Sequence, residues 1–152
     1  MSTQPDTYTG DILVLTRIFD APPKRVFAAW TDPQLLAQWW GPPGSVVKEV
    51  EVDLRVDGRY RIGILHPEGE LLFVRGVYRE IEPVGKLAFT WRWENPNMDI
   101  GESLVTLEFQ AEGEKTELRL SHALLPNAEA RAGHAEGWEG ILSELGDFLG
   151  NS

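Results

Sequence analysis

The sequence predicts a single α+β domain: an antiparallel sheet of six to seven strands beside a long C-terminal helix, with two short helices after the first strand. Two observations carry this prediction. The middle of the chain alternates apolar and polar residues between short turn clusters, as half-buried strands do. The last segment repeats apolar residues at helical spacing. The chain has 152 residues, so we expect one domain over 11–152 after a loose lead-in at 1–10.

The first strand and the first helix are predicted from composition and proline placement. Residues 11–20 are rich in apolar and β-branched side chains, which predicts a strand covered on both faces. The next segment opens with prolines, which suit a first helical turn because their missing N–H would be unpaired there. Val26, Phe27 and Trp30 then share one helical face. A short helix is therefore predicted over 23–30.

A second short helix is predicted from Pro33, with Asp32 as its N-cap. The Gly-Pro-Pro-Gly turn at 41–44 ends it. Trp39 and Trp40 are consecutive, and consecutive helical residues point about 100° apart. We therefore expect one of them to pack inward and the other to cover a cavity mouth or a partner surface.

Six further strands are predicted in the middle of the chain. They span 45–56, 59–66, 71–81, 86–94, 103–111 and 116–123. In the first of them Val46, Val50 and Val52 share a face, with Lys48 as the exception, which predicts a half-solvated strand. The Asp-Gly pair at 57–58 is a strong hairpin signal.

The final helix is predicted over 125–150. Its apolar residues recur at i, i+3, i+4 and i+7: Trp138, Ile141, Leu142, Leu145, Phe148 and Leu149. Gly133, Gly137 and Gly140 weaken its first half, because each costs about 1 kcal/mol relative to alanine in a helix interior. We therefore expect the helix to be strongest from about residue 134.

Composition excludes several functions. The net charge of −10 disfavours nucleic-acid binding, which needs a basic face to neutralise phosphates. The chain has no cysteine, so it has no disulfide and no thiol nucleophile, which fits a cytoplasmic location. Its N-terminus has no secretory signal pattern, and no apolar run approaches the ~20 residues that span a bilayer.

Metal and nucleophile motifs are also missing from the sequence. His66, His122 and His134 fall on three different predicted elements without a ligand-type spacing, so we expect no metal and no cofactor. Ser121 adjoins His122, but neighbouring strand residues point to opposite faces and cannot form a catalytic pair. No catalytic residue is predicted.

Two polar residues are candidate anchors for a ligand. His122 shares a strand face with Leu118 and Leu120, so it is either a hydrogen-bonded core histidine or a polar group inside a cavity. Arg61 either lies on the outer sheet face beside acidic residues or turns inward to bind a ligand carboxylate or phosphate.

Aromatic residues are numerous for a small core. Six tryptophans and six phenylalanines could fill the core, but ligand cavities are also walled mainly by apolar and aromatic groups. The candidate cavity-lining residues are Phe27, Trp30, Trp39, Trp40, Phe73, Phe89, Trp91, Trp93, Leu118, Leu120, His122, Trp138 and Leu142.

Several stretches resemble one known family along nearly the whole chain, in order. They are RIFDAPPKRVFAAWTDPQLLAQWWGPPG (17–44), DLRVDGRYRI (53–62), GVYREIEPVGKLAFTWRWE (76–94), TELRLSHALLP (116–126) and GHAEGWEGILSEL (133–145). The chain resembles the activator-of-heat-shock-protein-ATPase-homolog-like family of the START-like, or SRPBCC, superfamily. The resemblance implies a helix-grip fold, in which a curved sheet wraps a long helix and leaves a cavity between them.

The resemblance implies function only broadly, since the superfamily includes carriers, cyclases and chaperone activators. We expect a binding protein for a small hydrophobic or amphipathic molecule. The alternatives are a cyclase- or hydrolase-like enzyme that uses the cavity, and a stress-related or chaperone-linked module that presents an exposed tryptophan to a protein partner or forms a homodimer. Chaperone-activating members carry a separate N-terminal domain, and the first predicted strand here starts near residue 12, so we do not expect that activity.

Overall fold

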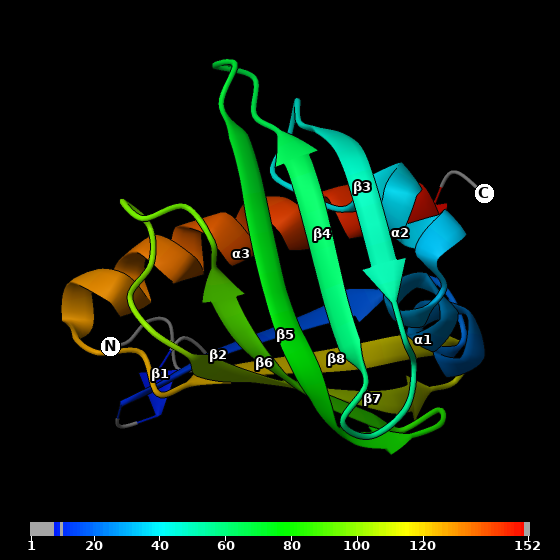
Figure 1. Ribbon diagram of the computed structural model, residues 1–152. Helices are drawn as coiled ribbons and strands as arrows, with labels where there is room; N and C mark the ends of the chain where they lie inside the picture. Colours follow the sequence, from blue (N-terminus) through cyan, green and yellow to red (C-terminus); the bar gives the residue numbers. More distant parts are fainter. Residues whose placement is uncertain (1–7, 10, 151–152) are drawn as a thin grey trace.

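A curved antiparallel sheet wraps one long helix in the computed structural model, which describes residues 8–9 and 11–150 (Figure 1). The strands are β1 (Tyr8–Thr9), β2 (Ile12–Phe19), β3 (Val46–Val52), β4 (Arg59–Leu65), β5 (Leu71–Glu82), β6 (Lys86–Trp93), β7 (Ser103–Glu112) and β8 (Lys115–Ala123). The helices are α1 (Pro23–Thr31), α2 (Pro33–Trp39) and α3 (Ala128–Gly150). The α+β helix-grip prediction is confirmed.

The strand order is β1-β2-β8-β7-β6-β5-β4-β3, with every neighbouring pair antiparallel. Seven longer strands match the predicted ones, and β1 is a two-residue addition at the edge. It falls within the predicted lead-in, whose other residues, 1–7 and 10, lie outside the described part of the chain. Strands β3 to β8 follow one another as sequential neighbours, as short turns between antiparallel strands require.

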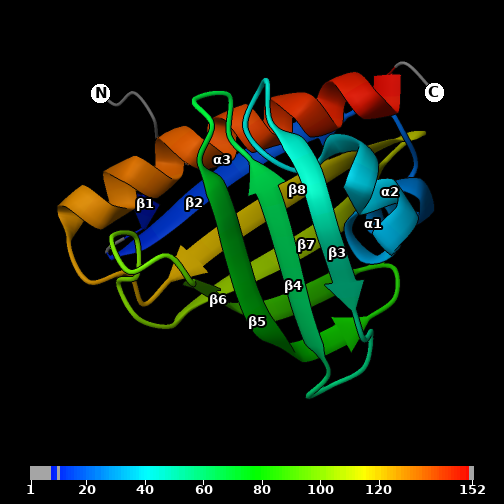
Figure 2. The ribbon, with the colours of Figure 1, turned by 45° about the horizontal axis from the view of Figure 1, so that its top comes forward.

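Helix α3 lies across the sheet, and α1 and α2 close one end beside its C-terminal half (Figure 2). The predicted apolar face of α3 is buried at Trp138, Ile141, Leu142, Leu145 and Leu149. The helix begins at Ala128, so the three glycines do not interrupt it. Burial of the apolar face outweighs their propensity cost, because tertiary packing supplies most helix stability in proteins. None of the described helices is apolar over a length that could cross a membrane.

Strand β3 departs from the predicted alternation because of a β-bulge. The register shifts between Val47 and Glu49, which pair with Ile64 and Gly63 respectively. Val47 therefore joins Val50 and Val52 in contact with the core, whereas Val46 is 52% exposed. The predicted grouping of Val46 with Val50 was wrong because an extra residue in one strand reverses the faces on its far side.

Strand β2 is covered on both faces only in its first half. Leu13, Val14 and Leu15 are buried in succession, but Ile18 is 54% exposed. The apolar sequence alone does not predict which part of the strand is buried on both faces, because this depends on which element packs against its outer face.

Helix α2 begins as predicted, with Asp32 Oδ1 accepting a hydrogen bond from the backbone N–H of Gln34 at 2.9 Å. It ends one residue before Trp40, whose backbone is extended at φ −63° and ψ 139°. The argument that Trp39 and Trp40 must diverge on a helix therefore does not apply. Both are buried, at 4% and 5% exposure.

Candidate functional site

A cavity of about 370 Å³ lies between α3 and the sheet. Its walls come from the α2–β3 turn, from β4, β5 and β6, from the β6–β7 loop and from one face of α3. The lining residues are Trp40, Gly41, Pro42, Ile64, Leu72, Trp91, Trp93, Met98, Ile100, Ala130, Gly133, His134, Gly137, Trp138 and Ile141. None of these is Asp, Glu, Lys or Arg. Such an apolar, aromatic lining with few polar groups is typical of small-molecule sites.

Small residues of α3 leave this space open. Ala130, Gly133 and Gly137 lie on the cavity side of the helix, where residues three and four apart share a face. A Cβ added at Gly133 or Gly137 would meet no heavy atom within 4 Å. At Gly140, by contrast, it would lie 3.0 Å from Pro43 Cδ. The first two glycines are therefore not required by close packing, and their effect is to leave the cavity unfilled.

The inner wall of the cavity is a set of contacting indole rings. The ring centroids of Trp91 and Trp138 lie 4.8 Å apart. Trp40 lies 5.9 Å from Trp91 and 5.8 Å from Trp138. Trp30 contacts Trp40 from behind at 5.8 Å, and Trp39 contacts Trp30 at 4.9 Å. Of the three tryptophans near the Gly-Pro-Pro-Gly turn, Trp40 is the one that lines this cavity.

A buried hydrogen-bond chain supports this wall. Trp138 Nε1 donates to His122 Nδ1 at 3.0 Å, so the imidazole proton lies on Nε2. His122 Nε2 then donates to Ser103 Oγ at 2.7 Å, and Ser103 Oγ donates to the carbonyl of Trp91 at 3.1 Å. Burial lowers the pKa of His122 well below its usual value, with a smaller contribution from His134. His122 is a neutral histidine with both ring nitrogens engaged.

His134 lines the cavity and is held in the opposite tautomer. Its Nδ1 lies 2.9 Å from the carbonyl oxygen of Ala130, which can only accept, so Nδ1 carries the proton. Nε2 is then an acceptor, and Trp93 Nε1 donates to it across 3.4 Å. Burial lowers the pKa of His134, and the Ala130 carbonyl partly offsets this. The cavity wall therefore holds a neutral imidazole whose lone pair has only a long hydrogen bond.

One further indole donor borders the cavity. Trp91 is 2% exposed, and its Nε1 has no hydrogen-bond partner within the described residues. A buried N–H without an acceptor costs roughly 1–3 kcal/mol. The packed indole rings of this wall therefore include one buried N–H without a hydrogen-bond partner among the described residues.

Four of the predicted cavity-lining residues line the cavity: Trp40, Trp91, Trp93 and Trp138. Seven others lie elsewhere in the buried core: Phe27, Trp30, Trp39, Phe89, Leu118, Leu120 and Leu142. Trp30 and Phe89 border a second space of only about 20 Å³, which is about the room of one water molecule. His122 lies behind the wall rather than in it. Strand alternation predicts the face on which a side chain lies. It does not predict whether that side chain borders the cavity or lies deeper in the core.

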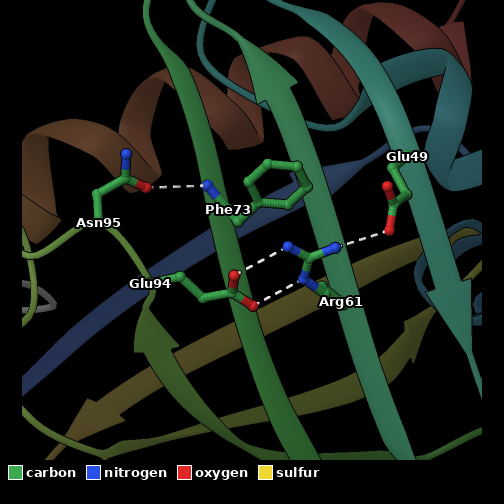
Figure 3. Close-up of polar contacts among 5 residues, drawn as sticks. All are labelled: Glu49, Arg61, Phe73, Glu94 and Asn95. Atoms are coloured by element: carbon green, nitrogen blue, oxygen red, sulfur yellow. Dashed lines mark hydrogen bonds and ion pairs between the residues drawn. The ribbon is translucent and has the colours of Figure 1, made fainter.

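Arg61 and Phe73 lie on the outer face of the sheet (Figure 3). Arg61 makes two hydrogen bonds to Glu94, at 2.7 and 2.9 Å, and one to Glu49 at 2.8 Å. Its guanidinium carbon lies 3.9 Å from the Phe73 ring centroid. Hydrogen bonding to Arg61 lowers the pKa of Glu94. Of the two alternatives predicted for Arg61, the structure has the one on the outer sheet face beside acidic residues. Arg61 does not line the cavity.

The sequence-based list omitted His134 and the small residues of α3. The three glycines were a signal in the sequence, because glycine in a helix interior costs about 1 kcal/mol relative to alanine. Met98 and Ile100 were also omitted. They come from the β6–β7 loop, whose fold over the cavity has no periodic signal in the sequence.

Two further observations concern the described residues. In the described chain no group of three His, Cys, Asp or Glu side chains is arranged to hold a metal ion. Trp40 is 5% exposed, so it does not present the exposed tryptophan that a docking module near the Gly-Pro-Pro-Gly turn would need.

Comparison with known proteins agrees with the architecture. Protein CV1439 from Chromobacterium violaceum is 28% identical, with a TM-score of 0.83 over 93% of this chain and 98% of its own. The AHSA1 protein from Silicibacter pomeroyi is 30% identical, with a TM-score of 0.82 over 91% and 97%. A Rhodobacter sphaeroides protein is 26% identical, with a TM-score of 0.81 over 95% of both chains.

No protein with a curated description matches the sequence. The profile of the family described as "Activator of Hsp90 ATPase homolog 1-like protein" matches residues 20–150. This span includes every helix and all the long strands except β2. The chain therefore belongs to the Activator of Hsp90 ATPase homolog 1-like family, within the START-like superfamily.

Proposed function

We propose that the protein binds a small hydrophobic or amphipathic molecule in the cavity between α3 and the sheet. The observation that carries this proposal is the pair Gly133 and Gly137. Each costs about 1 kcal/mol of helix stability relative to alanine, yet a side-chain carbon at either would meet nothing within 4 Å. Alanine would fit at both positions and would stabilise the helix. The glycines are therefore less favourable for helix stability, and they leave space open in the cavity.

The dimensions and lining of the cavity support the same proposal. A volume of about 370 Å³ lies within the range of roughly 300–1,000 Å³ found for small-molecule sites. The mouth is bordered by exposed residues, including Ile100, which is 40% exposed, and Gly133. A ligand has a path from solvent, and binding would bury apolar surface now in contact with water.

The geometry argues against catalysis by His122, the polar candidate that the sequence offered. Both ring nitrogens of His122 are engaged, by Trp138 and by Ser103, so no lone pair of this residue is free to take a proton from a substrate. An imidazole locked in this way serves to hold the wall in place.

The proposal is tested by titration with N-phenyl-1-naphthylamine, an uncharged apolar probe that fluoresces more strongly outside water. Wild type should show saturable one-to-one binding. Gly137→Leu should weaken it by at least about tenfold, which corresponds to roughly 1.4 kcal/mol, because the new side chain occupies the cavity. Gly133→Leu provides a second filling variant.

The matched control is Gly85→Leu in the β5–β6 turn, where the nearest atom to an added Cβ is 4.0 Å away. This variant should bind the probe as wild type does. Circular dichroism should show that all the variants are folded. Absence of saturable binding to wild type, or equal binding by wild type and both filling variants, would overturn the proposal.

A further inference from the structure

We propose that the cavity selects an uncharged aromatic molecule with a hydroxyl group, and that this hydroxyl bridges His134 Nε2 and Trp93 Nε1. This inference rests on the proposed function and specifies the ligand class for the same cavity. It follows from three features of the wall: its lack of charge, the fixed tautomer of His134 and the long contact between His134 and Trp93.

The first feature excludes charged ligands. The described residues that line the cavity include no acidic side chain, lysine or arginine. Arg61 cannot serve as a counter-ion, because it is paired with Glu94 and Glu49 on the outer face. Placing an ion in apolar surroundings without a partner costs far more than placing a neutral polar group there. A ligand carboxylate or phosphate would therefore lose hydration without gaining a partner.

The second feature fixes what the wall can offer. The Ala130 carbonyl accepts from His134 Nδ1 at 2.9 Å, and this leaves Nε2 as an acceptor. Trp93 Nε1 is a donor only. The wall thus presents one acceptor and one donor side by side, from α3 and β6.

The third feature shows that this pair is not in its best arrangement. The Nε1–Nε2 distance is 3.4 Å, which is well beyond the roughly 2.9–3.0 Å that is most common for N–H···O hydrogen bonds in proteins. The two groups can separate at little cost and accept a bridging group. A hydroxyl is the simple group that accepts from Trp93 and donates to His134 through one oxygen. A carbonyl would satisfy Trp93 but leave Nε2 without a donor.

The body of the ligand is inferred from the remaining wall. Trp91, Trp93 and Trp138 present indole rings, with centroids 5.5 Å apart for Trp91 and Trp93 and 4.8 Å for Trp91 and Trp138. Aromatic rings gain about 0.5–1.5 kcal/mol from edge-to-face or offset contacts beyond their buried area. A flat aromatic body therefore suits this wall better than a flexible chain of equal area.

The experiment compares 2-naphthol, naphthalene and 2-naphthoate at pH 7.5 by quenching of tryptophan fluorescence. These probes share one ring system and differ in their polar group. We expect 2-naphthol to bind about three- to tenfold more tightly than naphthalene, the gain expected of a net hydrogen bond. The anion 2-naphthoate should bind at least about tenfold more weakly than 2-naphthol.

His134→Leu should abolish the preference for 2-naphthol over naphthalene, because leucine offers no acceptor to the hydroxyl. Trp93→Phe, which keeps a ring and removes the donor, should reduce the same preference and covers the case in which His134→Leu does not fold. The matched control is His66→Leu beyond the end of β4, which should keep the wild-type preference.

The outcomes separate this inference from the proposed function. If naphthalene and N-phenyl-1-naphthylamine bind but 2-naphthol has no advantage, only the ligand class is overturned. The same holds if 2-naphthoate binds as tightly as 2-naphthol, or if the preference persists in His134→Leu and Trp93→Phe. If none of the uncharged probes binds, the proposed function itself fails.

Discussion

The indole N–H of Trp138 on α3 donates to His122 Nδ1 on β8 at 3.0 Å, deep in the core. This contact joins the helix to the sheet at the wall of the cavity. Because Trp138 can only donate, it requires a lone pair on Nδ1 and therefore a neutral imidazole. Ser103 accepts the remaining His122 proton, so the arrangement is consistent in only one protonation state.

The free energy of unfolding should consequently decrease as the pH is lowered from neutrality. The pKa of His122 is lowered in the folded protein, so above about pH 7 neither the folded nor the unfolded state is protonated at this residue. As pH falls below about 6.5, the unfolded state takes up a proton and the folded state does not. The free energy of unfolding should decrease by up to about 1.4 kcal/mol per pH unit from this residue. Chemical denaturation at pH 7.5, 6.5 and 5.5 measures this slope.

His122→Gln should flatten that slope. The matched control is His66→Gln in the β4–β5 turn, outside the buried hydrogen-bond chain of Trp138, His122, Ser103 and Trp91. His134, whose pKa is also lowered by burial, should account for part of the slope that remains. A slope unchanged by His122→Gln would show that His122 is not held neutral in the folded protein.

Ser103→Ala should destabilise the protein by about 1–3 kcal/mol, because the Nε2–H of His122 loses its acceptor in a site where water does not reach. Ser143→Ala, at an exposed position of α3, should change stability by less than about 0.5 kcal/mol. The measurement is the denaturant midpoint with the slope m held in common. Equal effects of the two substitutions would mean that the hydrogen-bond chain from Trp138 to Trp91 contributes nothing measurable to the free energy of unfolding.

Gly133→Ala and Gly137→Ala should each stabilise the protein by about 0.5–1 kcal/mol, because a methyl group fits open space and alanine is the better helix former. Gly140→Ala should gain less or destabilise, since its Cβ would lie 3.0 Å from Pro43. The measurement is the thermal unfolding midpoint of the three variants. They share one substitution, glycine to alanine, and differ in how closely the site is packed. Three equal shifts would show that helix propensity alone decides and that the close approach of Pro43 to Gly140 has no effect.

Arg61→Met should leave the binding of cavity probes unchanged, because Arg61 faces away from the cavity. Its side chain is 34% exposed and that of Glu94 23% exposed, so their coupling in a double-mutant cycle should be about 0.5–1 kcal/mol. Loss of probe binding in a folded Arg61→Met variant would contradict this prediction and would show that the outer face of the sheet affects binding in the cavity.

Much of the fold could be predicted because its signals are local. Asp32 and Pro33 set the start of α2 through one hydrogen bond and one fixed backbone angle. The apolar stripe of α3 and the alternation in β8 follow from the helical and strand periods. The bulge in β3 has no such signal, because it depends on the register with β4, and it moved Val47 to the core side.

The candidate site could be predicted only in kind. An abundance of aromatic residues indicates either a core or a cavity wall, and the same strand face supplies both. Trp91 borders the cavity, whereas Phe89, two residues earlier on that face, does not line it. His122 was a reasonable polar candidate, but its role depends on Trp138 and Ser103, which are distant from it in sequence.

The sequence by itself determined the order of the elements, the N-cap of α2 and the apolar faces of α3 and β8, because these depend on neighbouring residues and on fixed periods. The tertiary structure decided where space remains. Trp40 reaches the cavity because the backbone leaves the helix at that residue. Gly133 and Gly137 border open volume because no atom of a facing segment lies within 4 Å of the position that a Cβ would take. A cavity is a difference between opposing surfaces, and it exists only once distant segments are placed against each other.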